Sequence, residues 1–155
     1  MFIIPTIRLA LPDEAARIAL MSREYIEFDL GWSWRRGRVL QAMADPTINV
    51  AVAHAGDGGL LGFGIMEYAE QHAHLALLAV APAYQRQGAG ARLMGWLEAP
   101  ARLAGLEKIR LEVRADNPGA LAFYRRLGFA ATGRSAGYYG GVMDAVRMEK
   151  SLRLR

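Results

Sequence analysis

The chain has 155 residues, 53% of them hydrophobic, and a formal net charge of +4 at neutral pH. This length predicts a single domain over residues 1–155, with enough surface to bury a core of its own. Charged residues interrupt each apolar stretch, which excludes a membrane span, and the absence of cysteine excludes disulfides and a cysteine acyl-enzyme. The first residues lack the basic start and long apolar region of a secretory signal, so we expect a soluble, cytoplasmic protein.

The positive net charge suits an anionic ligand but does not single out nucleic acid. The arginines are scattered along the chain, without a basic stripe interleaved with aromatic residues and without zinc-finger spacing. The three histidines, His54, His72 and His74, lack the spacing of a metal site. We therefore expect neither nucleic acid nor a metal ion as a partner.

The first third of the chain predicts one strand and two helices. Residues 6–10 suit a strand, and a helix follows over 12–28, because a proline and two acidic residues occupy its first turn. A segment of glycine, serine and tryptophan, 31–34, ends this helix. A second helix is predicted over 35–44, before an Asp-Pro pair.

The middle of the chain predicts a hairpin and then a crossover unit. Apolar residues over 48–54 and 60–68 flank a glycine-rich turn, as in a pair of antiparallel strands. A strand over 73–81, a helix over 88–103 with an apolar stripe, and a strand over 108–114 follow. A strand, a helix of about four turns and another strand make a crossover, so these two strands should be parallel.

The last third predicts a capped helix and a hairpin. Asp116 or Asn117 caps a helix that has proline at its first position. Two strands near 130–135 and 144–152 flank a turn over 137–141, which is rich in glycine and tyrosine. The order of the elements indicates an α/β domain with a central sheet.

The junction over 77–90 joins an apolar strand to a helix through a short glycine loop, a geometry that binds phosphate through free amides and the helix dipole. Gly88 and Gly90 allow close approach of a ligand. A nucleoside triphosphate loop needs Lys followed by Ser or Thr, and neither follows Gly90. A dinucleotide fingerprint needs glycine where Leu93 stands, although Glu112 lies near the expected ribose-binding acid.

Two segments resemble the signatures of the GNAT superfamily of acetyl-CoA-dependent N-acetyltransferases. The glycine loop is similar to the Gln/Arg-x-x-Gly-x-Gly/Ala signature, and 116–129, with its Asn, Tyr and Leu-Gly-Phe, is similar to the second signature. The resemblance covers 75–148 well and 1–49 much less. It implies a mixed central sheet with a splayed parallel strand pair and helices on both faces.

The resemblance also implies where acetyl-CoA binds. Strand amides in the splayed gap would hold the acetyl and pantetheine groups, and loop amides would hold the pyrophosphate. The alternatives are that the strand residues are only core and that Asn117 is only a helix cap. The implied contacts are Leu78, Val80, Gln85, Arg86, Gln87, Gly88, Ala89, Gly90, Ala91, Asn117 and Tyr124.

Acetyl transfer to an amine needs a neutral nucleophile, a polarised carbonyl and a proton for the departing thiolate. The resemblance implies that Tyr124, the tyrosine of the second signature, supplies that proton. It follows Asn117 by seven residues, which puts both on nearly the same face of the helix. The alternative for Tyr124 is a packed aromatic side chain.

Two residues are candidates for the general base. Glu112 lies in a segment similar to the ribosomal-protein N-terminal alanine acetyltransferases, whose corresponding glutamate is the proposed base, and a pKa raised by partial burial would help it. His74 precedes Gln85 by eleven residues, where the histone acetyltransferase branch has its glutamate, and its ordinary pKa suits the task. The alternatives are a paired or solvated charge face on strand 108–114 and a structural histidine.

In this family the first two helices, their connecting loop and the last hairpin form the acceptor pocket. Acids there attract a cationic amine, and aromatic residues flank it; the tryptophans could instead be core residues. The Tyr-Tyr pair resembles the peptide-binding loop of the ribosomal-protein branch, but 140–144 lacks the Arg-Glu often seen there. The implied residues are Glu27, Asp29, Trp32, Trp34, Tyr138 and Tyr139.

The resemblance therefore implies direct transfer of acetyl from acetyl-CoA to a primary amine, without a metal. The acceptor is either a small amine or a peptide or protein N-terminus, and whether the chain forms a homodimer stays open. The alternative is a non-catalytic acyl-CoA-binding sensor or regulatory module of the same fold.

Overall fold

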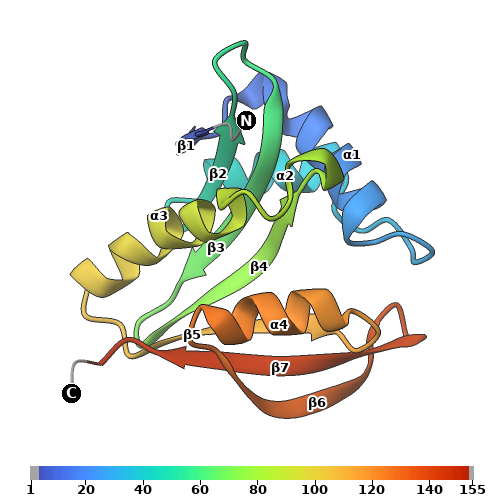
Figure 1. Cartoon of the computed structure of the whole chain (residues 1–155), viewed down its shortest axis with the longest axis vertical. Helices are drawn as coiled ribbons and strands as arrows, with labels where there is room; N and C mark the ends of the chain where they lie inside the picture. Colours follow the sequence, from blue (N-terminus) through green and yellow to red (C-terminus); the bar gives the residue numbers. More distant parts are fainter. Residues whose placement is uncertain (1–3, 154–155) are drawn as a thin grey trace.

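The structure, a computed structural model, describes residues 4–153, so the ends of the predicted domain, 1–3 and 154–155, lie outside the described residues. A seven-stranded sheet in the order β1-β2-β3-β4-β5-β7-β6 forms its centre (Figure 1). The strands are β1 (Thr6–Leu9), β2 (Ile48–His54), β3 (Leu60–Tyr68), β4 (His72–Val80), β5 (Lys108–Arg114), β6 (Ala130–Tyr139) and β7 (Met143–Ser151). The helices are α1 (Ala15–Tyr25), α2 (Arg36–Ala44), α3 (Ala89–Leu103) and α4 (Pro118–Arg126), with 3₁₀ turns at Pro12–Glu14 and Pro82–Tyr84.

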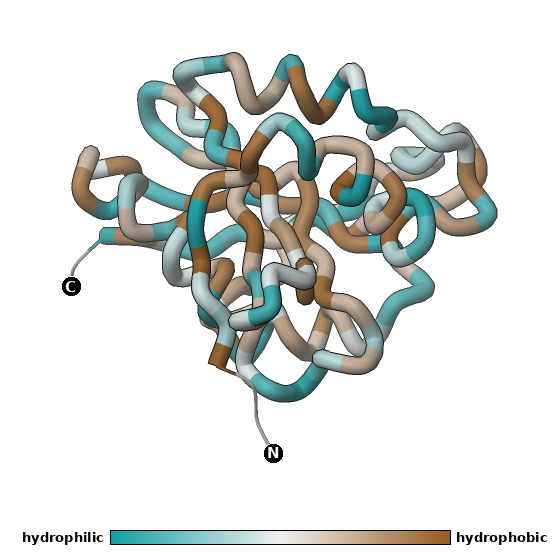
Figure 2. Tube along the Cα trace, turned by 90° about the horizontal axis from the view of Figure 1, so that it is seen from above, coloured by the Kyte–Doolittle hydropathy of each residue, from teal (hydrophilic) through white to brown (hydrophobic). Residues whose placement is uncertain are grey.

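Helices cover both faces of the sheet, each over its own apolar core. On one face, Ile18 of α1 and Val39 of α2 pack with Phe63 of β3. On the other face, Leu97 of α3 packs with Ile109 of β5, and α4 lies over β5 and β7 (Figure 1). Hydrophobic positions gather toward the middle of the molecule (Figure 2). The predicted α/β fold with a mixed sheet and helices on both faces is confirmed.

The parallel strands β4 and β5 separate halfway along their length. Their pairing covers four residue pairs and ends at Leu75 and Leu111. Beyond that point β4 continues to Val80 beside β3, and β5 continues to Arg114 beside β7. The predicted splayed parallel pair is therefore confirmed, and it opens a gap in the middle of the sheet.

A bulge in β4 lies where the strands separate. Met66 of β3 pairs with Leu75 and Ile65 pairs with Leu77, so Ala76 is an extra residue. Leu75 consequently belongs to the core under α3, whereas Leu77 belongs to the core under α1 and α2. The bulge thus reverses which face of the sheet the alternating side chains of β4 enter.

Two predicted boundaries are wrong. The first helix ends at Tyr25, not at 28, because the N–H groups of Ile26 and Glu27 both bond the Ser22 carbonyl and close the last turn. The turn predicted over 137–141 is shorter, because β6 continues to Tyr139 through an irregular stretch of its pairing with β7. The other predicted elements agree within about two residues, the usual uncertainty of an element's end. Among residues 4–153 no helix is long and apolar enough to cross a membrane.

Candidate active site

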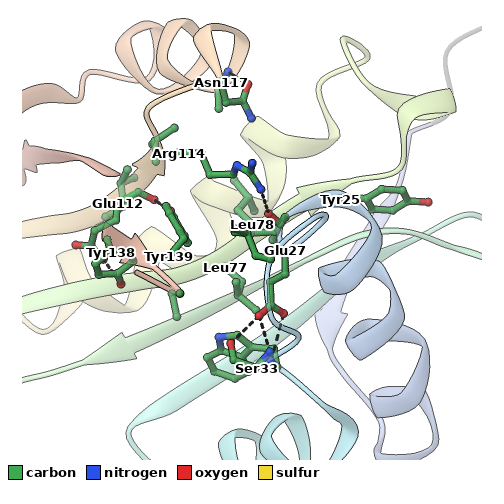
Figure 3. Close-up of a pocket in the computed structure, with 18 of the residues that line it drawn as sticks. Tyr25, Glu27, Ser33, Leu77, Leu78, Glu112, Arg114, Asn117, Tyr138 and Tyr139 are labelled. Carbon is green, nitrogen blue, oxygen red and sulfur yellow. Dashed lines mark hydrogen bonds between the residues drawn. The ribbon is translucent and has the colours of Figure 1, made fainter. Parts of the chain in front are cut away.

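A cavity of about 760 Å³ opens where β4 and β5 separate. The segment between α1 and α2, the two strands, the start of α4 and the β6–β7 hairpin all contribute to its wall. Figure 3 shows Glu112, Tyr138 and Tyr139 on one side and Glu27 and Ser33 on the other. The structure therefore brings together residues from five separate parts of the sequence.

The main chain of β4 presents polar groups to this gap. The Ala81 N–H donates to the Leu61 carbonyl of β3, so by alternation the main-chain groups of Leu78 and Val80 point away from β3. The Gln85 side chain confirms this direction, since its Nε2 donates to the Val80 carbonyl at 3.0 Å. The side chains of Leu78 and Val80 pack against the core, as expected.

The glycine loop before α3 has the geometry of an anion site. Arg86 and Gly88 adopt positive φ values of 63° and 89°, and alternating conformations of this kind turn successive N–H groups toward one point. Within the described residues, the main-chain N–H groups of 86–91 have no hydrogen-bond partner. The Gln85 N–H is different, because it donates to Pro82 at 3.4 Å. Residues 86–91 can therefore cradle a phosphate.

Gly90 has a packing role that the sequence did not indicate. A Cβ at this position would lie 3.0 Å from the Phe123 ring of α4, whereas a Cβ at Gly88 would meet nothing within 4 Å. Gly90 therefore allows α3 and α4 to approach each other, and a substitution there would disturb packing as well as the loop.

Asn117 and Tyr124 of α4 both line the cavity. Asn117 is the helix cap, because its Oδ1 accepts from the Ala120 N–H at 3.0 Å. The Tyr124 ring packs edge-on against Phe123 and Phe129. Its hydroxyl has no hydrogen-bond partner among the described residues. Every fully buried side-chain polar atom of these residues has such a partner, so the Tyr124 hydroxyl is not fully buried and reaches the cavity that this residue lines. Burial raises the pKa of Tyr124, and the hydroxyl therefore keeps its proton at neutral pH.

The two candidate bases are hydrogen-bonded to each other. Nε2 of His74 lies 2.6 Å from Oε1 of Glu112, and the Tyr138 hydroxyl donates to the same oxygen at 2.9 Å. A carboxylate only accepts, so Nε2 of His74 carries the hydrogen in this contact. The Tyr139 hydroxyl donates to the main-chain carbonyl of Glu112 at 3.2 Å. His74 and Glu112 thus form one unit, with the glutamate on the cavity wall.

Glu112 does not have the raised pKa that would help it to act as a base. Burial does raise it, but the hydrogen bond and charge of His74, with smaller contributions from Tyr138 and Arg110, outweigh burial and leave the pKa below its ordinary value. Glu112 is consequently an ionised carboxylate at neutral pH. Burial raises the pKa of Tyr138 to about 12, with Glu112 adding to the effect.

Glu27 lines the cavity, but its carboxylate is used inside the connecting segment. Its Oε1 accepts from the main-chain N–H and the hydroxyl of Ser33, and its Oε2 accepts from the Ser22 hydroxyl and the Trp34 N–H. The residue is 6% exposed. Four hydrogen bonds of this kind make Glu27 the organiser of the segment rather than a free negative charge.

The two tryptophans of the connecting segment line the cavity and stack with arginines of the chain itself. The Arg38 guanidinium lies 3.8 Å from the Trp34 ring centre, and those of Arg35 and Arg23 lie 4.8 and 5.3 Å from the Trp32 ring centre. The Trp32 indole N–H also donates to a carbonyl of α1. The aromatic faces expected to flank a cationic amine are therefore already covered by cations.

Asp29 is placed outside the cavity wall, which corrects its expected position. Its carboxylate pairs with Arg114 of β5 at 3.2 Å, and Arg114 also pairs with Asp116 at 3.0 Å. The guanidinium donates further to the carbonyls of Ile26 and Phe28. Arg114 thus ties the segment after α1 to the end of β5.

Sequence reasoning missed three residues of this region. For Arg114 the only signal was the alternation of charged residues along its strand. The neighbouring sequence does not show that Asp29, 85 positions away, pairs with it. Arg35 and Arg38 had only their nearness in sequence to Trp32 and Trp34 as a signal, because both tryptophans precede the helix and no helical spacing relates them to the arginines.

Residues 17–129 match the profile of the acetyltransferase (GNAT) family. A ribosomal protein bS18-alanine N-acetyltransferase of Escherichia coli strain K12 is 37% identical over 95 residues, which are 59% of this chain and 64% of that relative. The crystal structure of the ribosomal-protein-S18-alanine N-acetyltransferase from Escherichia coli superposes with a TM-score of 0.80 at 25% identity, over 98% of this chain and 96% of the other.

A second solved structure, Ard1 from Thermoplasma volcanium, has the same fold, with a TM-score of 0.85 at 24% identity over 97% of this chain and 99% of the other. The family profile covers well over half of the chain, and the second signature segment contributes Asn117, Ala120 and Tyr124 to the cavity wall. The chain belongs to the GNAT family of acetyltransferases.

Proposed function

We propose that the protein transfers acetyl from acetyl-CoA directly to the α-amine of a peptide or of a small molecule. One observation carries this proposal: three features meet at the gap between β4 and β5. They are the free main-chain amides of β4, the ionised carboxylate of Glu112 and the protonated hydroxyl of Tyr124. The loop N–H groups of 86–91 would hold the pyrophosphate, and the main chain of Leu78 and Val80 would bond the pantetheine and acetyl groups.

The residues of the cavity have distinct roles in this proposal. Glu112 attracts the ammonium form of the acceptor and takes up its proton, directly or through water. The neutral nitrogen attacks the thioester carbon, the C–S bond breaks, and Tyr124 protonates the sulfur. The products are the acetylated amine and free CoA, and the second amine proton returns through water to Tyr124. His74 is a positioning residue, because its Nε2–H holds the glutamate.

The lowered pKa of Glu112 favours α-amines over alkylamines as acceptors. With ordinary pKa values of about 7.8 and 10.4, about 33% of an α-amine but about 0.1% of a lysine-type amine is neutral at about pH 7.5. A weakly basic carboxylate assists little in deprotonating the latter. The likeness to the ribosomal protein bS18-alanine N-acetyltransferase also supports an N-terminal acceptor. Homodimerisation, a cytoplasmic location and the absence of nucleic acid as a partner stay predictions.

Calorimetry with acetyl-CoA, followed by a thiol-release assay with mass detection of the acetylated product, tests this function. The acceptors are peptides beginning with Ala, Ser or Met, the same peptides with a blocked N-terminus and an internal lysine, and spermidine. We expect binding of acetyl-CoA and product only with the free α-amines. Acetyl-CoA binding without product from any acceptor would favour the non-catalytic sensor, and no binding at millimolar concentration would reject both.

A further inference from the structure

The acceptor side of the cavity carries positive charge that the described chain does not neutralise. Arg35 and Arg38 line the cavity. The ion pairs within residues 4–153 include neither of them, nor Arg36 beside them. The other charged residues of the wall are engaged, since Glu27 has four hydrogen bonds and Arg114 is paired with two carboxylates.

The position of these arginines is unfavourable for the helix that carries them. Arg35 is the N-cap of α2, and Arg36 and Arg38 lie in its first turn, which contains no acidic residue. Cations at this end of a helix are repelled by the helix dipole. The helix dipole therefore disfavours three arginines at this point, although two of them stack on tryptophans, whereas an anion bound there would be attracted by both the arginines and the dipole.

The arginines are also held ready to bind. Arg38 stacks on Trp34 with 3.8 Å between its Cζ and the ring centre, and Arg35 stacks on Trp32 at 4.8 Å. Stacking uses the flat face of a guanidinium and leaves the N–H groups at its edge free. Such an edge matches the two oxygens of a carboxylate.

The arginines share one cavity with the candidate base. Arg38 lines it together with Tyr138, whose hydroxyl donates to Glu112 at 2.9 Å. The cavity thus has a negative pole at Glu112, suited to an ammonium group, and a positive pole at Arg35 and Arg38. An acceptor with two positive groups, such as a polyamine, would meet repulsion at the second pole.

From this geometry we infer that the acceptor carries a carboxylate close to its α-amine, which Arg38 and Arg35 bind while Glu112 holds the amine. This inference rests on the proposed acetyl transfer and names its substrate class. The carboxylate has two sources that share this chemistry: the acidic side chain of a peptide near its N-terminus, or the α-carboxylate of a free amino acid.

Matched acceptors test the inference. One series consists of C-terminally amidated peptides that begin with Ser and differ only at the second position, which is Asp, Asn or Lys. A second series compares free serine and aspartate with their α-amides. We expect kcat/KM for at least one carboxylate acceptor to exceed that of its amide by about tenfold, and the Lys peptide to be the poorest of its series. The series that shows the difference identifies the source of the carboxylate.

Variants of α2 assign the effect to residues. Arg38→Gln should reduce the carboxylate-to-amide ratio to about twofold, and Arg38→Glu should reverse the order of the Asp and Lys peptides. Arg36→Gln removes the same charge from the same turn, but Arg36 does not line the cavity, so the ratio should stay near tenfold. Circular dichroism and thermal unfolding show whether each variant is folded.

The outcomes separate the inference from the proposed function. Acetylation with carboxylate-to-amide ratios below about twofold in both series, or ratios that Arg38→Gln and Arg35→Gln leave unchanged, would overturn the inference and leave the acetyl transfer intact. Absence of product with every acceptor, although acetyl-CoA binds, would overturn the transfer itself.

Discussion

The side of the cavity that we assign to acetyl-CoA presents main-chain groups, and the acceptor side presents side chains. The first consists of the β4 backbone beyond Leu75 and the loop amides of 86–91, all within one stretch of sequence. The second combines residues of the α1–α2 connection, β5 and the β6–β7 hairpin, which meet only in the folded chain. A binding site made of main-chain groups needs only glycines and a strand-to-helix junction. A site made of side chains needs particular residue types that the fold brings together from distant parts of the sequence.

The largest expected effect tests the acceptor side. Glu112→Gln should lower kcat/KM by about 100-fold or more, because it removes both the negative charge that holds the acceptor's ammonium group in the cavity and the group that receives its proton, while the affinity for acetyl-CoA stays within about twofold. Glu149→Gln is the control, since Glu149 pairs with Lys108 and Arg110 outside the cavity. Steady-state kinetics and calorimetry give both quantities. Equal activity of the two variants would remove Glu112 from the mechanism.

The next effect tests the backbone side. Ala91→Glu should weaken acetyl-CoA binding by about 30-fold, because it places a negative charge beside the proposed pyrophosphate site. An acid in the first turn of α3 favours the helix, so the variant should fold. Gly95→Glu adds the same side chain one turn later, at an exposed position with open space, and should bind acetyl-CoA normally. Calorimetry that finds the same affinity in both variants would place the ligand elsewhere.

A smaller effect is expected where the two sides meet. Tyr124→Phe should lower kcat by about tenfold without changing the affinity for acetyl-CoA, because the hydroxyl has no hydrogen-bond partner within residues 4–153 and only the proton donor is lost. Tyr68→Phe removes a hydroxyl that donates to the Leu97 carbonyl at 2.6 Å. That control should cost about 1 kcal/mol of unfolding free energy and leave kcat unchanged. Wild-type turnover in Tyr124→Phe, with chemistry limiting the rate, would assign Tyr124 to packing.

The smallest effect is a shift in pH dependence. Activity should need ionised Glu112, so kcat/KM should fall as the pH drops through the lowered pKa of this residue. His74→Leu removes the contact that opposes burial, so the pKa of Glu112 should rise and the acid limb of the profile should move to higher pH. His72→Leu changes the same strand two residues away and should leave the profile in place. A profile that is identical for wild type and His74→Leu would contradict the positioning role of His74.

The difference between the two sides also explains what the sequence predicted. The parallel crossover and the glycine loop followed from local patterns, because strand length, glycine and proline act over a few residues, whereas the splay of the parallel pair was implied by the family resemblance. Helix and strand positions agreed except near residues 26–28 and 137–139, where the boundary depends on particular main-chain contacts, the bonds of Ile26 and Glu27 to Ser22 and the pairing of Tyr139 with Met143, that residue type does not reveal.

The acceptor side was harder to predict because its charges are paired across the fold. The sequence offered Glu27 and Asp29 as free acids, but the first organises its own segment and the second pairs with Arg114. Likewise, Glu112 and His74 were rival bases in the sequence and are hydrogen-bonded to each other across β4 and β5. Residue type and spacing show which groups are present, and only the tertiary contacts show which remain free.

The short β4–β5 ladder has a consequence for the energetics of the whole sheet. Four residue pairs connect the block β1–β4 to the block β5–β7 within the sheet, so amide hydrogen exchange should find this line among the first places to open. A molecule lodged in the gap contacts both blocks and spans that line. A free ligand concentration of about 100 times the Kd would add ~2.7 kcal/mol to the free energy of unfolding. The opening that admits a ligand therefore also makes the protein's resistance to unfolding depend on whether the ligand is there.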